Sequence, residues 1–535
     1  MLRLTEIKLP IAHSESELQN AILAKLGIAA DELIAHVVYK RGVDARKKNC
    51  ILYSYTLDVT VCDEAAILAR IGTNPHIKIA PDISYHFVTH APQDLAARPV
   101  VIGMGPAGLF AGLLLAQMGF RPLILERGKA VRERTQDTWG LWRKGVLNPE
   151  SNVQFGEGGA GTFSDGKLYS QIKDPRFLSR KVLDEFVKAG APPEILYESH
   201  PHIGTFKLVG MVEKMRATIQ SLGGKIRFQS RVDDIEISDG KVQAVVLANG
   251  ERIATNHLVL AIGHSARDTF EMIHKRGIFI EAKPFSIGFR IEHPQTVIDR
   301  ARLGANAGNP QLGAADYKLV YHASNGRSVY SFCMCPGGTV VAAASEVGRV
   351  VTNGMSQYSR NERNANAGIV VGITPEVDYP GDPLAGMEFQ RRWESRAYEL
   401  GGATYQAPGQ LVGDFLAGRA STKFGKVTPS YTPGVHLTDL ASALPDYAIA
   451  AIREALPEFA KQINGFDMAD AVLTGVETRT SSPIRIKRNA HDLQSINTRG
   501  LYPTGEGAGY AGGILSAAVD GIEIAEAVAL SMMGK

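Results

Sequence analysis

Residues 99–128, PVVIGMGPAGLFAGLLLAQMGFRPLILERG, determine how the chain folds. The apolar residues at 100–102 predict a buried strand, and the glycines at 103, 105 and 108 follow it in the spacing G-x-G-x-x-G. The next apolar run predicts a helix over 109–118, and residues 123–125 predict a second strand. This order of strand, glycines, helix and strand is typical of the first half of a Rossmann-type dinucleotide-binding fold.

Each part of the motif has a physical role in binding a dinucleotide. The first glycine permits the tight turn, the second lets the backbone approach a pyrophosphate at the helix N-terminus, and the third allows helix and strand to pack closely. An acid 18 residues after the third glycine is placed to accept from ribose hydroxyls, which favours FAD or NAD over NADP. The cofactor contacts predicted here are Gly103, Gly105, Pro106, Ala107, Gly108, Glu126 and Arg127.

Composition excludes several classes of protein. A chain of 535 residues predicts two to four domains, and a net charge of +3 is too small to favour nucleic acid or a membrane surface as a partner. Its four cysteines argue against a disulfide scaffold. The apolar run 100–119 is interpreted as strand plus helix rather than a membrane span. With no apolar leader at the N-terminus, the expected location is cytoplasmic.

Residues 1–90 read as a separate N-terminal domain. The pattern strand, helix, strand, strand, helix, strand predicts a ferredoxin-like α+β unit, with Ser14 and Glu17 as a capping box for its first helix. A basic stretch at 40–48 lies between the two middle strands. Its simplest interpretation is a solvated hairpin loop; the alternative is a contact with an anion, a partner or the flavin domain.

A second glycine-rich stretch, residues 152–168, also contains the spacing G-x-G-x-x-G. No clear strand precedes it and no good helix start follows, so a second dinucleotide fold is rejected. The stretch instead predicts a loop whose backbone lies against a flat ligand, where side chains would clash. The predicted contacts are Gly158, Gly159, Ala160, Gly161 and Thr162.

Residues 225–263 predict a strand, a three-stranded antiparallel excursion with turns at Asp239-Gly240 and Asn249-Gly250, and a buried strand that ends in glycine. At this point the chain resembles the two-dinucleotide-binding-domain flavoproteins of the glutathione-reductase-like superfamily. The resemblance implies that the backbone of Val232 meets adenine and that the strand ending at Gly263 closes over the cofactor.

The C-terminal stretch 499–514, RGLYPTGEGAGYAGGI, resembles the flavin motif of the same superfamily. There an acid, usually Asp, bonds the ribityl chain, and the next helix directs its N-terminus at the flavin O2 edge. Glu506 occupies the acid position here. The residues that this resemblance places at the flavin are Gly505, Glu506, Gly512, Gly513 and Ile514.

These motifs, the run FCMCPGG at 332–338 and the N-terminal appendage together are similar to a bacterial family of FAD-dependent (NAD/FAD-utilising) dehydrogenases. The resemblance covers about 98–263 and 499–531. It implies an α/β fold with a Rossmann-type FAD-binding domain of three layers, formed by 98–265 and 485–535. Residues 266–484 would be an inserted α+β substrate domain, in which 349–366 is expected to be a loop.

A few residues are candidates for the chemistry itself. Cys333 and Cys335 form a C-x-C pair that is interpreted either as buried packing or as a flavin-facing thiol; a strand would point both thiols to one face. No metal site is predicted, because ligands at zinc-like spacing are lacking. His264 follows the glycine at the end of a buried strand. Weaker candidates for acid–base work or anion binding are His200, His202, His293, His322, Arg290, Lys423 and Lys426.

The sequence therefore predicts an FAD-dependent oxidoreductase that transfers a hydride between flavin N5 and a small-molecule substrate that is not identified. NAD(P)H is left open as a transient co-substrate, and so is the oligomeric state. One alternative is a flavin-dependent reductase of a C=C bond in a lipid or aromatic, with a deep apolar pocket in the insertion. A flavin-bound factor that interacts with RNA or protein through residues 41–48 is another alternative, although nucleic acid is not expected.

Overall fold

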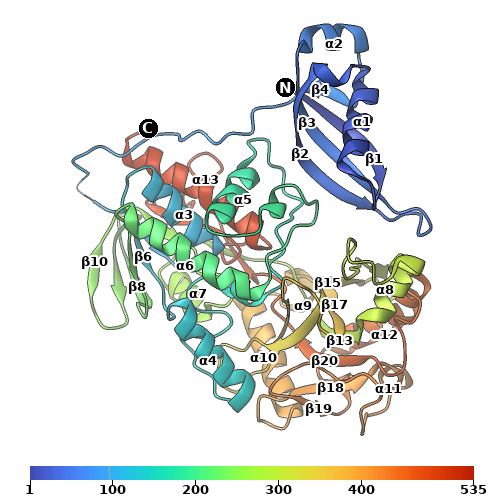
Figure 1. Cartoon of the computed structure of the whole chain (residues 1–535). Helices are drawn as coiled ribbons and strands as arrows, with labels where there is room; N and C mark the ends of the chain where they lie inside the picture. Colours follow the sequence, from blue (N-terminus) through green and yellow to red (C-terminus); the bar gives the residue numbers. More distant parts are fainter. Residues whose placement is uncertain (96) are drawn as a thin grey trace.

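The computed structural model describes residues 1–95 and 97–535 (Figure 1). Its N-terminal unit is a four-stranded antiparallel sheet in the order β2-β3-β1-β4, with both helices packed on one face. This is the strand order of a ferredoxin-like fold. Ser14 and Glu17 form the capping box expected at the first helix. The elements are β1 (Leu2–Pro10), α1 (Glu15–Leu26), β2 (Leu33–Asp44), β3 (Leu52–Val61), α2 (Glu64–Ile71) and β4 (Ile77–Ile79).

The segment 99–128 forms the centre of a five-stranded parallel sheet in the order β22-β11-β5-β6-β7. Because successive side chains of a strand point to opposite faces of the sheet, each strand contributes to the hydrophobic cores on both faces. Val101 packs toward the helices α3 and α13, while Val100 and Ile102 face the opposite side. The strands are β5 (Val100–Ile102), β6 (Leu123–Leu125), β7 (Lys225–Arg227), β11 (Leu258–Leu260) and β22 (Leu501–Pro503).

Helices cover the first face of this sheet, and a small antiparallel sheet with one helix covers the second. Helix α3 is in contact with α13 and α6, and α13 with α5, as Figure 1 shows. The helices are α3 (Pro106–Gln117), α4 (Val131–Lys144), α5 (Leu178–Lys188), α6 (Thr205–Ser221), α7 (Arg267–Lys275) and α13 (Ile514–Met532). The small sheet consists of β8 (Val232–Ser238), β9 (Lys241–Leu247) and β10 (Arg252–Ala254). The helices on the first face, the parallel sheet, and the small sheet with α7 on the second face are the three layers that position the site.

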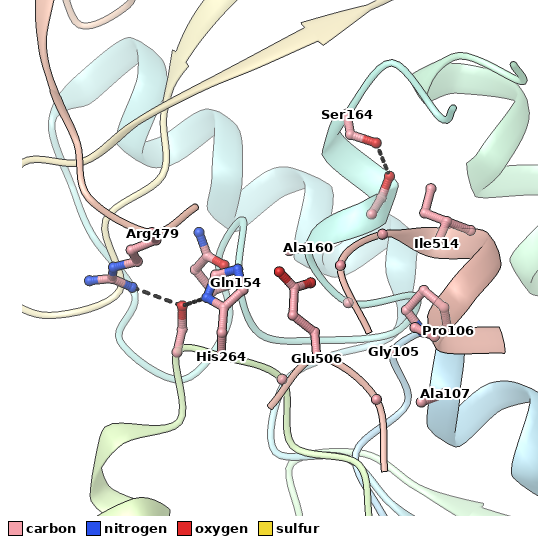
Figure 2. A pocket seen from close by; sticks show the side chains of 18 of the residues that line it. Gly105, Pro106, Ala107, Gln154, Ala160, Ser164, His264, Arg479, Glu506 and Ile514 are labelled. Atoms are coloured by element: carbon pink, nitrogen blue, oxygen red, sulfur yellow. Dashed lines mark hydrogen bonds between the residues drawn. The ribbon is translucent and has the colours of Figure 1, made fainter. Parts of the chain in front are cut away.

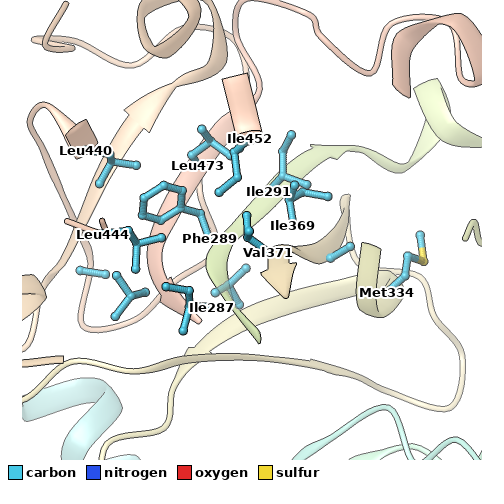
Figure 3. Packing of buried hydrophobic residues seen from close by; sticks show 14 of the residues in the cluster. Ile287, Phe289, Ile291, Met334, Ile369, Val371, Leu440, Leu444, Ile452 and Leu473 are labelled. Atoms are coloured by element: carbon cyan, nitrogen blue, oxygen red, sulfur yellow. The ribbon is translucent and has the colours of Figure 1, made fainter. Parts of the chain in front are cut away.

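The insertion is built on an eight-stranded sheet, in the order β14-β15-β17-β13-β20-β18-β19 with β16 paired to β15. Apolar side chains from β13, β17 and β20 pack against α12 around Phe289 and Ile452 (Figure 3). The strands are β13 (Phe285–Pro294), β14 (Val320–His322), β15 (Ser328–Ala342), β16 (Thr352–Ser356), β17 (Asn364–Ile373), β18 (Ala407–Leu411), β19 (Val435–Leu437) and β20 (Val472–Glu477). Two further strands, β12 (Ile280–Ala282) and β21 (Ile484–Ile486), pair with each other.

The prediction of a loop over 349–366 is wrong, because β16 and the start of β17 fall within it. These polar strand residues are buried: Asn364 donates to Glu292 at 3.0 Å and Asn366 accepts from Arg290 at 3.1 Å. A strand whose polar groups are satisfied by tertiary partners has no apolar periodicity to reveal it. The helices of the insertion are α8 (Gln295–Leu303), α9 (Pro375–Asp378), α10 (Ala385–Leu400), α11 (Val412–Ala417) and α12 (Asp446–Gln462).

The basic stretch at 40–48 contacts the rest of the molecule: the interpretation as a solvated hairpin loop is wrong for Arg41, which is partly buried, whereas Lys48 is exposed and its side chain makes one contact. Arg41 pairs with Glu198, and its backbone bonds the segment 197–199 on both sides. Lys48 donates to the carbonyl oxygen of Ala301 at 2.7 Å. The N-terminal unit therefore docks both on the part that carries the parallel sheet and on the insertion. No helix formed by residues 1–95 and 97–535 has the length and apolar character needed to cross a bilayer.

Candidate functional site

A cavity of about 610 Å³ lies between the carboxyl ends of the parallel strands and the sheet of the insertion. The three glycine-rich segments meet there, although they are far apart in the sequence. Figure 2 shows Gly105, Pro106 and Ile514 on one side of the pocket and His264 on the other, with Glu506 projecting between the two sides. Of the predicted cofactor residues, those lining the cavity are Gly103, Gly105, Pro106, Ala107, Glu126, Arg127, Gly159, Ala160, Gly161, Val232, Gly263, Gly505, Glu506, Gly512, Gly513 and Ile514.

Two helices begin at this cavity. Helix α3 starts at Pro106 with Gly105 as its N-cap, and α13 starts at Ile514 with Gly513 as its N-cap. Neither N-cap supplies a side chain that bonds the first turn. The positive ends of two helix dipoles therefore face the same space, where they favour negatively charged ligand groups.

The glycine segments bring backbone close to backbone. A Cβ atom at Gly108 would overlap the carbonyl oxygen of Gly103, and one at Gly159 would lie 2.8 Å from the Cα atom of Gly105. By contrast, a Cβ atom at Gly263, Gly512 or Gly513 would meet nothing within 4 Å among the described residues. Gly108 and Gly159 therefore allow close backbone packing at the turn, whereas Gly263, Gly512 and Gly513 border open space. An extended dinucleotide requires both a tight turn and open space beside it.

Glu126 stabilises the glycine turn between β5 and α3. Its carboxylate is buried and accepts from the backbone N–H of Met104 at 2.8 Å, Gly128 at 2.9 Å and Gly156 at 3.0 Å. It thus ties the first glycine segment to the second, an attachment that the sequence analysis did not foresee. The contact with ribose stays a prediction.

Arg134 on α4 holds the second glycine segment and was missed from sequence. Its guanidinium is fully buried and donates to the carbonyl oxygens of Asn152, Val153 and Glu157 at 2.7–2.8 Å. Three residues predicted to contact the cofactor lie behind the lining rather than in it. Gly108 packs on Gly103, Gly158 donates to Met104 at 2.8 Å, and Thr162 is buried.

Glu506 projects into the cavity, with no hydrogen bond from its carboxyl to any residue of 1–95 or 97–535 (Figure 2). Burial raises the pKa of this carboxyl to about 7, opposed by the charge of Lys283 and increased by that of Cys333. Near neutral pH the group therefore exchanges between its acid and its carboxylate.

His264 lines the cavity at the end of β11, and its Nδ1 lies 2.9 Å from the Ser265 hydroxyl, which also accepts from Arg479 at 3.1 Å. Burial, together with the charge of Arg479, lowers the pKa of His264 to about 3. The imidazole is therefore neutral at physiological pH. Arg479 is in turn held by Glu394, which also pairs with Arg267.

The two cysteines are placed differently. Cys333 lines the cavity, whereas Cys335 is fully buried behind it and donates to the carbonyl oxygen of Cys333 at 3.3 Å. The expectation that both thiols follow strand alternation is wrong here. The register of β15 shifts on both sides of Cys335, and Cys333 has a φ of 43°.

The weaker candidates lie outside the cavity lining. His293 is buried and bonds the carbonyl oxygen of Phe466 at 2.6 Å, and Arg290 is committed to Glu477 at 2.8 Å. His200, His202 and His322 make surface or backbone contacts, and Lys423 and Lys426 are exposed.

The insertion contributes a wall that sequence reasoning did not identify. It mixes apolar side chains with Asp316, Lys318 and Asn353, and Lys167 and Tyr169, at and just after the end of the second glycine segment, also line the cavity. This mixture differs from the deep apolar pocket expected for reduction of a lipid C=C bond. Only tertiary structure brings these residues together, so no local signal could have found them.

Comparison with known proteins gives two family matches and one full-length relative. Residues 284–480 match the family described as "FAD-dependent protein, C-terminal domain-like", and residues 1–60 match a domain of unknown function. A protein of Clostridium beijerinckii described as uncharacterized is 50% identical over 532 residues, which is 98% of each chain. These matches support a flavoprotein family with FAD as the cofactor.

Two solved structures to which the chain is similar share little sequence with it. Glycine oxidase from Geobacillus kaustophilus is 12% identical, with a TM-score of 0.34 over 81% of this chain and 94% of that one. The L-amino acid deaminase from Proteus myxofaciens is 12% identical, with a TM-score of 0.36 over 84% of this chain and 93% of that one.

Proposed function

The chain belongs to the same protein family as its Clostridium beijerinckii relative, and we propose that it is an FAD-dependent oxidoreductase. The reaction proposed is hydride transfer between flavin N5 and a small organic substrate, with NAD(P)H as a candidate co-substrate. One observation carries the proposal: three glycine-rich segments and two helix N-termini converge on one cavity. The finer assignment, to the two-dinucleotide-binding-domain flavoproteins, is part of the proposal and rests on the motifs at 103–108 and 505–514.

The residues present fit FAD, which when bound would supply the hydride chemistry. The N-terminus of α3, with Gly105 and Glu126 nearby, would hold the pyrophosphate and the ribose. The N-terminus of α13 offers bare N–H groups that would stabilise negative charge on a flavin ring bound there. Glu506 would bond the ribityl chain or hold a proton close to the ring, since its pKa of about 7 allows both forms. His264, whose pKa is lowered to about 3, stays neutral near pH 7 and has no imidazolium proton to donate.

The first test is the cofactor itself. Purified full-length protein should show flavin absorbance bands, and denaturation should release FAD at about one equivalent per chain. A colourless protein that neither binds added FAD nor gains thermal stability from it would contradict the proposal.

The second test separates electron donors. Under anaerobic conditions, rapid bleaching of the flavin bands by NADH or NADPH would support a nicotinamide-driven reductase. Absence of bleaching by either nucleotide would overturn the role given to NAD(P)H and indicate that the substrate is itself the electron donor.

A further inference from the structure

His264 stands where a ligand of the parallel sheet is expected. It follows Gly263 directly, just beyond the carboxyl end of β11, and ligands of open α/β sheets bind outside the carboxyl ends of the strands. Both residues line the cavity, and a Cβ atom at Gly263 would meet nothing within 4 Å among the described residues. The imidazole therefore lies at the edge of open space, across the pocket from Ile514 (Figure 2).

The two nitrogens of the His264 ring have different surroundings. Nδ1 lies 2.9 Å from the hydroxyl oxygen of Ser265. Nε2 forms no hydrogen bond with any residue of 1–95 or 97–535, yet it is not among the fully buried polar atoms that lack a partner. Because His264 lines the cavity, the open side of Nε2 is the side that faces the cavity.

The Ser265 hydroxyl determines which ring nitrogen carries the proton. Arg479 donates to its oxygen at 3.1 Å, and a guanidinium group has no acceptor to offer in return. The proton of this buried hydroxyl therefore needs another acceptor, which among the described residues is Nδ1 of His264. A proton on Nδ1 would leave the buried O–H without a partner, which is unfavourable. Nδ1 is thus unprotonated, and the neutral ring carries its proton on Nε2.

The surrounding residues keep this arrangement in place. The Arg479 guanidinium is buried, lies 2.8 Å from the Glu394 carboxylate and donates to the Ser345 hydroxyl at 2.6 Å. It therefore stays charged and directed at Ser265. Burial, followed by the charge of Arg479, lowers the pKa of His264 to about 3, so the ring gains no second proton near neutral pH.

We propose that Ser265 is a positioning residue that holds His264 as a neutral Nε2–H donor, and that this donor bonds an oxygen atom of FAD. The inference rests on the proposed function, which supplies FAD as the ligand of the cavity. A nitrogen that always donates selects for an acceptor, and the phosphate and carbonyl oxygens of FAD are acceptors. Because the ring is neutral, His264 orients the ligand without adding a charge to the site.

The first experiment determines the tautomer by nitrogen NMR of the full-length, flavin-free protein with isotope-labelled histidine rings. The signals of His264 are those that disappear in His264→Leu. At neutral pH, Nδ1 should resonate as an unprotonated ring nitrogen and Nε2 as a protonated one. The opposite tautomer, or an even mixture of the two, would overturn the role given to Ser265.

Two serine variants test the source of this preference. Ser265→Ala removes the hydroxyl from Nδ1 and should convert the His264 signals to those of two exchanging tautomers. Ser345→Ala is the matched control, because it removes the other buried hydroxyl that Arg479 binds and leaves the bond between Ser265 and His264 in place. It should keep the wild-type tautomer. An unchanged tautomer in Ser265→Ala would overturn the positioning role.

The second experiment adds FAD. When Nε2–H gains an oxygen acceptor, its signal should move and its proton should exchange with water severalfold more slowly. His264→Leu should raise the Kd of FAD roughly twofold to tenfold, the factor that corresponds to one neutral hydrogen bond. His274→Leu, on α7 and outside the cavity lining, should leave this Kd unchanged.

The outcomes separate this contact from the proposed function. FAD that binds without changing the Nε2–H signal, or with equal affinity in His264→Leu, would overturn the contact while the proposed function stands. Absence of FAD binding by the wild type would overturn both. The tautomer is measured without flavin, so the role of Ser265 is decided separately.

Discussion

The role of a single side chain in the cavity depends on its surroundings, and two residues of the same type can differ in role. Glu506 and Glu126 are both cavity carboxyls, yet only Glu126 accepts three backbone N–H groups. Glu506 has its pKa raised to about 7 by burial. These hydrogen bonds give Glu126 a structural role in addition to its proposed ribose contact, whereas Glu506 is left free to bind a ligand or a proton.

Glu506→Gln should make stability less dependent on pH. Between pH 4.5 and about 7 the native carboxyl holds its proton more tightly than the unfolded one, so wild-type stability is lost as the pH rises through that window. The variant lacks this loss, so its free energy of unfolding should exceed that of wild type by an amount that grows to about 3 kcal/mol by pH 8. Thermal unfolding of the two flavin-free proteins from pH 5 to 8 measures this difference in stability. Parallel pH profiles for the two proteins would contradict the raised pKa of Glu506.

Glu394→Gln should destabilise the protein strongly. The carboxylate is fully buried and pairs with both Arg267, at 2.7 Å, and Arg479, at 2.8 Å. Its loss leaves two buried cations short of a partner, at a cost of about 3–5 kcal/mol. The matched control is Glu399→Gln on the same helix, whose side chain is 65% exposed and pairs with Arg396. That change should cost less than about 0.5 kcal/mol in the same unfolding experiment.

Among helices and strands, α3 shows how a local motif determines tertiary geometry. Gly108→Ala should abolish flavin binding, because the new Cβ would overlap the Gly103 carbonyl oxygen and push the helix away from the turn. Gly210→Ala on α6 is the control, since a Cβ there meets nothing within 4 Å among the described residues. It should keep its FAD and gain up to about 1 kcal/mol of stability. Flavin content per chain, after purification and added FAD, compares the two.

Prediction from sequence succeeded where structure is encoded locally. The strand, glycine turn and helix around 99–128 are visible in spacing, as are the hairpins near 239 and 249. The strand β16 was missed because its polar residues are satisfied by distant partners. The cavity wall from Asp316 to Asn353 was missed for the same reason: its members meet only when the insertion folds over the parallel sheet.

The whole molecule depends on how its parts dock. Arg41→Ala should loosen the N-terminal unit, because it removes the ion pair with Glu198 beside the backbone bridge to 197–199. Hydrogen exchange at Ser199, whose N–H donates to the Arg41 carbonyl oxygen at 2.8 Å, should become severalfold faster. Arg46→Ala is the control, since Arg46 pairs with Asp44 in its own loop. Equal exchange in both variants would show that the ion pair contributes nothing to docking.

The N-terminal unit contacts both sides of the cavity, through Glu198 on one and Ala301 on the other. If ligand binding rotates these sides relative to each other, the two docking contacts must strain or break. Binding in the cavity and attachment of the N-terminal unit are then thermodynamically coupled. Such coupling is reciprocal: a partner that releases the unit would change ligand affinity by the same factor by which the ligand changes affinity for that partner.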